Sequence, residues 1–254
     1  MLVSVLASGS EGNSTYVETA DVKLLIDAGM NTKYIKESLE KLGVDLNEIE
    51  YIFMTHAHKD HTGALNVLLK KYKPTVIVSK GIYEELDVIH DYKSLLITDE
   101  PVRCGNTTID NFKTSHDAAG SRGYLITDAV SSMVYMTDTG YLNQKYFKKL
   151  YNKDIYVMEA NHDVEMLMNG PYPAWLKTRI FSDKGHLSNN ASGFYLAKLI
   201  GPDTKKVILA HLSHENNTPE TALKTVKKTL KEYDIDFNNI DIAKQKEVVE
   251  VKIW

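Results

Sequence analysis

The chain has 254 residues, of which 43% are hydrophobic and 25% are charged, and its formal net charge is −4. A folded chain of this length buries about 70–75% of the surface exposed by its unfolded form. The composition, with only 6 Pro, argues against a disordered, collagen-like or low-complexity protein. The single cysteine, Cys104, excludes a disulfide framework within the chain and favours a reducing compartment.

The first 45 residues predict three strands and one helix. Short apolar runs separated by Gly-rich or small polar turns predict strands at 2–7, 14–18 and 22–27, paired as an antiparallel meander. A helix is predicted over 31–42, with Asn31 as its N-cap and Gly43 closing it.

The sequence contains no predicted membrane segment. The apolar run at the N-terminus lacks the basic residues that begin a secretory signal, and no run reaches the roughly 18 apolar residues of a membrane helix. We therefore expect a cytoplasmic protein with no membrane partner.

From residue 51 onward, short strand-like runs alternate with stretches of helical period. The predicted strands are 51–54, 75–79, 107–114, 123–127, 133–136, 155–158, 207–210 and 248–253, and the predicted helices are 65–72, 142–150, 190–199 and 219–233. Arg103, Gly105 and Asn106 predict a turn beside Cys104, which favours an unreactive thiol over a catalytic one. No flexible linker divides the series, so we expect one α/β domain over 1–254.

Two segments far apart in the chain share one pattern. YIFMTHAH at 51–58 and KVILAHLSH at 206–214 both place a histidine directly after an apolar strand. Strands from two halves of the protein that deliver histidines to one place would create a shared site between them. A chance similarity is the alternative, because the pattern is short.

The densest group of metal-binding side chains is THAHKDH at 55–61. His56 and His58 can point to one side of an extended turn, whereas Asp60 and His61 can point to a second position as the next helix begins. One tetrahedral ion cannot take all four side chains from so short a loop without strain, so two adjacent ions are the better interpretation. A solvated polar loop is the alternative.

Three further metal-competent residues lie where predicted strands end: His116, Asp138 and His211. Gly140 allows the backbone after Asp138 to turn close to a metal. Each residue alone is better explained as a polar turn residue. Together with the cluster at 55–61, they favour metal ligands.

These motifs resemble the metallo-β-lactamase superfamily. THAHKDH resembles its T-H-x-H-x-D-H signature, and the later His116, Asp138 and His211 follow in the order found in that family. SGSEGNS, SHDAAG, EANHD, KGHLSNN and AHLSHENN resemble the YycJ/WalJ-type metallo-hydrolases, which are similar to the nucleic-acid-processing branch that includes RNase Z.

The resemblance implies an αβ/βα sandwich, in which two mixed sheets face each other with helices on the outer faces and the metals lie at the sheet edge. It implies that His56, His58 and His116 hold one ion, that Asp60, His61 and His211 hold the second, and that Asp138 bridges the two. The interval between Asp138 and His211 is too short for a β-CASP insertion, so a compact single-domain version is expected.

Two divalent ions about 3.5–4 Å apart can activate one bridging hydroxide and stabilise both oxygens of an in-line displacement, which suits phosphodiester hydrolysis. A donor set of only histidine and carboxylate side chains suits Zn²⁺ best, and it also suits Mn²⁺ or Fe²⁺. We count Asp60 among the catalytic residues. His186, which follows Gly185 in KGHLSNN, is the predicted general acid for the leaving alkoxide, with a helix-capping histidine as the alternative.

Eight other polar residues are predicted to contact substrate: Ser8, Ser10, Asn13, Asn161, Lys177, Arg179, His214 and Asn217. Lys177 and Arg179 lie near Tyr172 and Trp175 in the sequence, a combination that accepts phosphates and a stacked base. Glu159 and Asp117 are candidates to hold the far nitrogen of a metal-bound histidine, and a purely structural role is the alternative for all these residues.

The leading prediction is a metal-dependent phosphodiester hydrolase, an exonuclease acting on DNA or RNA, with nucleic acid as its partner and a homodimer as one option for its assembly. The slightly negative net charge does not by itself indicate a nucleic-acid binder. Two alternatives stay open. One is a thioester, lactone or small cyclic-phosphodiester hydrolase, and the other is a non-catalytic binding protein with the same fold.

Overall fold

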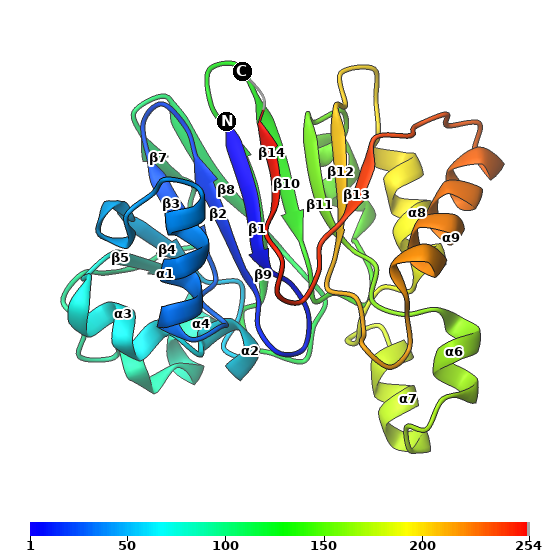
Figure 1. The fold of residues 1–254 in the computed structure, drawn as a ribbon, viewed down its shortest axis with the longest axis horizontal. Coiled ribbons are helices and arrows are strands. Elements are labelled where there is room, and N and C mark those ends of the chain that lie inside the picture. Colours follow the sequence, from blue (N-terminus) through cyan, green and yellow to red (C-terminus); the bar gives the residue numbers. More distant parts are fainter. Residues whose placement is uncertain (253–254) are drawn as a thin grey trace.

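Two mixed sheets face each other, with helices on their outer faces (Figure 1). The computed structural model describes residues 1–252, and within that range each sheet has seven strands. This architecture confirms the expected four-layer α/β sandwich. None of the helices in the described range is long and apolar enough to cross a membrane.

The first sheet has the order β14-β1-β2-β3-β4-β5-β6. Its strands are β1 (Leu2–Ala7), β2 (Ser14–Glu18), β3 (Lys23–Ile26), β4 (Tyr51–Phe53), β5 (Thr75–Val78), β6 (Leu95–Ile97) and β14 (Val249–Lys252). The strands β1 to β3 form the expected antiparallel meander, and β3 to β6 are parallel. The predicted last strand is confirmed over 249–252, whereas Ile253 lies outside the described residues.

The second sheet has the order β13-β12-β11-β10-β9-β8-β7. Its strands are β7 (Val102–Cys104), β8 (Thr107–Lys113), β9 (Arg122–Thr127), β10 (Ser132–Met136), β11 (Ile155–Glu159), β12 (Lys206–Ala210) and β13 (Ile240–Ile242). Here too an antiparallel meander, β7 to β10, leads into parallel strands, β10 to β13. The carboxyl ends of both parallel sets therefore reach one edge of the sandwich.

Nine α-helices and three short 3₁₀ helices connect the strands of the described chain. The α-helices are α1 (Thr32–Lys41), α2 (Lys59–Thr62), α3 (Leu65–Lys71), α4 (Lys80–Glu85), α5 (Phe147–Leu150), α6 (Val164–Asn169), α7 (Ala174–Phe181), α8 (Asn189–Leu199) and α9 (Pro219–Glu232). The 3₁₀ helices are Leu46–Glu48, Asp87–Ile89 and Gln144–Tyr146. In Figure 1, α6 and α7 extend from the body of the molecule at the lower right.

The helix boundaries follow from their capping residues. The Asn31 side chain accepts a hydrogen bond from the Tyr34 amide, and Gly43 has a φ of +76°, so both predicted ends of α1 are confirmed. The predicted helix over 142–150 is wrong in extent. Asn143 is extended and accepts from the Lys145 amide, which allows only a 3₁₀ turn followed by the short α5.

Three apolar layers hold the sandwich together. One cluster fills the space between the sheets and includes Val5, Ile26, Phe53, Ile126 and Ile208. A second packs the outer face of the first sheet against α1 and α3, and a third packs the outer face of the second sheet against α8 and α9. Burial of these faces fixes the sheets, so the strand ends at the shared edge are held on a rigid frame.

The lone cysteine lies away from this edge. Cys104 ends β7, and Gly105 has a φ of +57° in the turn that follows, as predicted. Burial raises the pKa of the Cys104 thiol, which disfavours the reactive thiolate.

Candidate metal centre

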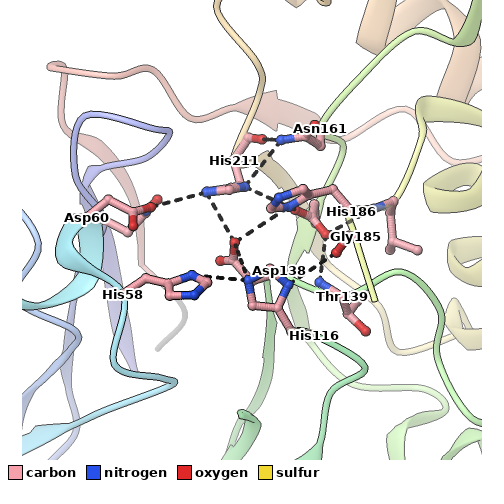
Figure 2. Close-up of polar contacts among 12 residues, drawn as sticks. His58, Asp60, His116, Asp138, Thr139, Asn161, Gly185, His186 and His211 are labelled. Carbon is pink, nitrogen blue, oxygen red and sulfur yellow. Dashed lines mark hydrogen bonds and ion pairs between the residues drawn. The ribbon is translucent and has the colours of Figure 1, made fainter. Parts of the chain in front are cut away.

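The seven predicted metal ligands lie together at the edge where the parallel strands end. Figure 2 shows five of them, His58, Asp60, His116, Asp138 and His211. His56 and His58 follow β4, and Asp60 and His61 lie in α2. His116, Asp138 and His211 follow strands β8, β10 and β12 of the second sheet. The ligand atoms form overlapping groups within 4.8 Å: His56, His58 and His116; Asp60, His61 and His211; and His56, His61 and Asp138.

Asp138 lies between the two sets of histidines. Its Oδ2 is 3.3 Å from His61 Nε2, and its Oδ1 is 3.4 Å from His211 Nε2 and 3.9 Å from His116 Nε2. Asp60 Oδ2 is 3.3 Å from His61 Nε2 and 3.8 Å from His211 Nε2. Asp138 therefore lies between the two predicted ligand sets, and the division into two metal sites stays a prediction.

Three of these ligand atoms make no hydrogen bond within the described structure although they are buried: His56 Nε2, Asp138 Oδ2 and His211 Nε2. A buried polar atom without a partner costs free energy, so such atoms are rare in folded proteins. Imidazole nitrogens and carboxylate oxygens that converge in this way are the donors of divalent metal sites. The residues present therefore fit bound metal ions.

The backbone is also strained at this edge. Asp138 has a φ of +54° and His211 a φ of +58°, in the left-handed region that non-glycine residues rarely occupy. Ser8 stabilises the second turn, because its Oγ accepts a hydrogen bond from the His211 amide at 2.7 Å.

Asp27 orients one candidate ligand from the first sheet. This fully buried residue follows β3 with a φ of +61°, and its Oδ2 is 2.7 Å from His61 Nδ1 and from Thr55 Oγ1. Burial raises the pKa of Asp27, and His61 opposes that effect. The sequence analysis missed this residue, although LLIDAG places an aspartate after a strand just as MTDTG does at Asp138.

Glu159, at the end of β11, orients a candidate ligand from the second sheet. Its Oε1 lies 3.0 Å from His211 Nδ1 and 2.8 Å from His186 Nδ1, while its Oε2 accepts from the Thr139 and Leu187 amides. Burial opposes ionisation, but His186 and then His211 lower the pKa of Glu159 to about 2. The structure therefore places Glu159 where the sequence analysis suggested, against the far nitrogen of a candidate ligand.

Two pairs of candidate histidine ligands have pKa values shifted in opposite directions. Burial lowers the pKa of His56 well below its usual value and also lowers that of His116. Burial acts in the same direction on His61 and His211, but there the carboxylates prevail. Asp27 and Asp138 raise the pKa of His61, while Asp138, Asp60 and Glu159 raise the pKa of His211 to about 10.

A cavity of about 260 Å³ opens onto these residues. One wall is formed by His58, Asp60, His116, Asp138 and His211, and the opposite wall by Tyr172 together with Leu176, Arg179 and Ile180 of α7. His186 also lines this cavity, which we call the metal cavity, and its ring lies 5.2 Å from the rings of His211 and His116. Gly185 is required before it, because a side chain there would collide with the Ile180 carbonyl.

Asp117 connects the metal ligands to α7. Its Oδ1 is 3.4 Å from His116 Nε2 and 3.9 Å from His58 Nε2, and its Oδ2 is 2.6 Å from Arg179 Nε. On His116 it therefore faces the nitrogen that points into the site. On His58 it faces the far nitrogen, as the sequence analysis suggested, because His58 Nδ1 is the nitrogen that lies 3.4 Å from His116 Nε2.

The predicted substrate-binding residues separate into two groups. Ser10, Asn161 and Arg179 line the metal cavity. The other five do not line it: Ser8, Asn13, Lys177, His214 and Asn217.

Those five have other contacts. Asn13 Nδ2 bonds Asp60 Oδ2 at 3.1 Å, and Asn217 exchanges side-chain bonds with Asn189. Lys177 Nζ bonds the Met168 carbonyl, and the exposed His214 lines a neighbouring cavity with Ser8 and Asn217. Ser8, Asn13 and Asn217 are buried, so their contacts indicate support of the site in place of the predicted contact with substrate.

Comparison with known proteins gives the same fold. The model of the metallo-beta-lactamase superfamily matches residues 7–211. The chain is 37% identical over 251 residues to exodeoxyribonuclease WalJ of Streptococcus pneumoniae serotype 2 (strain D39 / NCTC 7466), covering 94% of this chain and 93% of that protein. It is 36% identical over 234 residues to exodeoxyribonuclease YycJ of Bacillus anthracis, covering 90% and 89%. The crystal structure of the metallo-beta-lactamase fold protein YhfI from Bacillus subtilis superposes with a TM-score of 0.71 at 19% identity, over 98% of this chain and 99% of that one.

Proposed function

Because this chain belongs to the metallo-β-lactamase superfamily, we propose that it is a metal-dependent exodeoxyribonuclease, a hydrolase that removes nucleotides from the end of a DNA strand. The observation that carries the proposal is the convergence of seven histidine and aspartate side chains at one edge of the sandwich, five of which line the metal cavity. Two relatives that cover most of the chain are named exodeoxyribonucleases, which supports DNA as the substrate.

The proposed ligands are those predicted from the sequence. His56, His58 and His116 would hold one divalent ion, Asp60, His61 and His211 would hold another, and Asp138, which lies between the two sets, would be a ligand as well. When bound, such ions supply a Lewis acid and an activated water for phosphodiester hydrolysis. The histidine-rich donor set suits Zn²⁺ best, and it also suits Mn²⁺ and Fe²⁺.

The two buried carboxylates fix which nitrogen of each ligand faces the ions. His61 donates from Nδ1 to Asp27, and His211 donates from Nδ1 to Glu159. Each ring therefore directs the lone pair of its Nε2 into the metal site. Asn13 holds the carboxylate of Asp60 from the other side.

His186 is the proposed general acid. Its Nδ1 is occupied by Glu159 at 2.8 Å, so Nε2 is the nitrogen left to give a proton to the leaving alkoxide. The ring lines the metal cavity, and the carboxylate of Glu159 fixes its orientation. A histidine that only capped α8 would not need this contact, and Ser188 caps that helix instead.

The α7 wall of the metal cavity is the proposed contact for the terminal nucleotide. Tyr172, Leu176 and Ile180 offer an apolar surface to a base, and Arg179 offers a guanidinium to a phosphate. Asp117 holds that guanidinium beside the metal ligands. Asp60 is both a ligand and the catalytic carboxylate of the proposal.

A single domain over 1–254 without a β-CASP insertion, and a cytoplasmic location, are parts of the same proposal. The homodimer stays a prediction that sedimentation analysis would test.

The test uses metal-loaded protein and single- and double-stranded oligonucleotides, DNA beside RNA, labelled at either end. We expect DNA to shorten progressively from one end, to be protected by a chelator, and to be cleaved again after a divalent ion is restored. Asp138→Asn should abolish cleavage, whereas Asp91→Asn, which removes an exposed carboxylate outside the site, should not.

Two results would overturn the proposal. Hydrolysis of a thioester, lactone or cyclic dinucleotide without cleavage of DNA would indicate a different hydrolase. Binding of DNA by the metal-loaded protein without hydrolysis of any phosphodiester would indicate a binding protein.

A further inference from the structure

A second cavity, of about 250 Å³, lies beside the metal cavity. Its lining includes Lys113 and Thr114 at the end of β8, Ser115, Tyr141, and Lys145 with Tyr146 in the 3₁₀ turn before α5. We call it the Lys113 cavity. Neither the predicted ligands nor the predicted substrate-binding residues line it.

The two cavities share a wall made of two chain segments. Ser115 lines the Lys113 cavity and the next residue, His116, lines the metal cavity; Asp138 lines the metal cavity and Tyr141 lines the Lys113 cavity. Hydrogen bonds join these segments, from the Gly140 amide to the Ser115 carbonyl at 2.8 Å and from the Ser115 amide to Thr139 Oγ1 at 3.0 Å. A polymer that leaves the metal centre over this wall therefore enters the Lys113 cavity.

The charge of the Lys113 cavity is uncompensated. No carboxylate lines it, and within residues 1–252 neither Lys113 Nζ nor Lys145 Nζ has an acidic oxygen within 4.0 Å. The nearby Lys149 differs, because its Nζ lies 2.7 Å from Asp110. Two unpaired ammonium groups in one hollow repel each other and are stabilised when an anion enters.

The Lys113 cavity also offers aromatic surface. Tyr141 is 39% exposed, and Lys145 Nζ lies 4.9 Å from the centroid of the Tyr146 ring. An exposed ring beside cations is the combination that binds single-stranded nucleic acid, because the ring stacks on a base while the ammonium groups contact phosphates.

We propose that the Lys113 cavity is a subsite for single-stranded DNA, which holds nucleotides of the strand beyond the one being cleaved. Lys113 and Lys145 contact backbone phosphates, and Tyr141 stacks on a base. This inference rests on the proposed function, since it takes the strand to begin at the metal cavity. The two cavities then hold different parts of the strand. The terminal nucleotide lies against α7 in the metal cavity, and the following nucleotides cross the shared wall into the Lys113 cavity.

The first test measures binding of a fluorescent ten-nucleotide phosphorothioate oligo-dT to metal-loaded protein by anisotropy, over a range of salt concentrations. Each phosphate contact to a single strand contributes about −0.7 to the slope of log affinity against log salt. Lys113→Ala/Lys145→Ala should therefore reduce the magnitude of the slope by about 1.4 and weaken binding about 10- to 30-fold at 0.1 M salt.

The matched control is Lys224→Ala/Lys231→Ala, which removes two exposed lysines of the distant α9 that also have no ion-pair partner in the described structure. The control should keep the wild-type slope. Equal slopes for the wild type and the Lys113/Lys145 variant, or an equal loss in the control, would overturn the subsite.

A second test examines stacking. Tyr141→Ala should weaken binding of the same oligonucleotide about 10-fold, and Tyr141→Phe should restore it, because the phenyl ring keeps the stacking surface. An equal loss in both variants would overturn the stacking role.

A third comparison distinguishes this inference from the proposed function. The ratio of wild-type to Lys113→Ala/Lys145→Ala kcat/KM should be larger for an unmodified decanucleotide than for a dinucleotide. Equal ratios would overturn the subsite while leaving the nuclease intact. Absence of cleavage by the wild type would overturn the function, and the phosphorothioate binding data would still decide whether the cavity binds DNA.

Discussion

The two sheets support the metal centre in the same way but leave different groups at the surface. In the first sheet, Asp27 binds His61 and Thr55, and all three side chains are buried. In the second sheet, Glu159 binds His211 and also His186, whose ring reaches the metal cavity. Thr55 Oγ1 also lies 3.0 Å from His56 Nδ1, so the first network contacts only candidate ligands. The second network joins a candidate ligand to the proposed proton donor.

The pKa values of the two carboxylates shift in opposite directions. Burial raises the pKa of Asp27, whereas two histidines lower the pKa of Glu159 to about 2 despite burial. One support is thus repeated in the two sheets for two ligands of the same proposed metal site, and only the copy with Glu159 also contacts the proposed proton donor. The variants below test that difference.

The largest effect is expected at the end of the Glu159 network. His186→Ala should reduce kcat on DNA by about 10²- to 10⁴-fold, because the leaving alkoxide loses its proton donor, while the protein keeps its bound metals. Steady-state kinetics and metal analysis of the same preparation check both points. Unchanged turnover would remove His186 from the mechanism.

Glu159→Gln should damage both functions of its network. Loss of the charge leaves His186 and His211 poorly oriented, so we expect metal affinity to fall about 10- to 100-fold and kcat to stay low at saturating metal. Activity measured against metal concentration separates these effects. Full recovery of kcat at high metal would show that Glu159 supports only the ligand.

Asp27→Asn should affect metal binding alone. The neutral amide supports the His61 ring less well, so metal affinity should fall about 10- to 100-fold, but kcat at saturating metal should approach the wild-type value. A kcat as low as that of Glu159→Gln would contradict the distinction between the two networks.

The two proposed metal sites should also differ in their pH dependence. Carboxylates raise the pKa of His61 and the pKa of His211, the latter to about 10, so at neutral pH a metal must displace protons from these rings. Burial lowers the pKa of His56 and that of His116, so those rings bind metal without losing a proton.

Affinity at the His61 and His211 site should therefore decrease as the pH falls below about 10, by about tenfold per pH unit for each displaced proton. At the other site, His56 and His116 should contribute little to the pH dependence near neutral pH. Calorimetric titrations in buffers with different heats of ionisation count the protons, and equal counts for the two sites would contradict this assignment.

The smallest effect is expected far from both networks. Cys104 ends an edge strand, and burial raises its thiol pKa, so Cys104→Ser should change the free energy of unfolding by less than about 1 kcal/mol and leave kcat unchanged. Loss of activity in this variant would restore the alternative of a functional thiol.

The sequence predicted the long, strongly patterned elements of this fold well. The meander β1 to β3, the helices α1, α3, α8 and α9, and the strands that precede His56, Asp138 and His211 all lie where the periodicity placed them. Three-residue edge strands such as β6 and β7, and short helices such as α4 and α7, were missed. They are too short for a period to emerge, and tertiary contacts decide their structure.

The candidate site could be predicted where its residues follow strands. The strands of the repeated pattern, β4 and β12, lie in different sheets, and both deliver predicted ligands to the shared edge. Asp27 could not be paired with His61 in this way, because their contact depends on how β3 packs beside β4. Ser8 and Asn217 were assigned to substrate because a sequence does not reveal that a polar loop residue is buried and hydrogen-bonded.

The central claim is that the seven clustered side chains hold two divalent ions. Metal analysis of protein purified without added metal, before and after reconstitution with Zn²⁺, Mn²⁺ or Fe²⁺, tests it most directly. Two tightly bound equivalents per chain after reconstitution with at least one of these ions are predicted. Fewer than two equivalents under every condition would contradict the account.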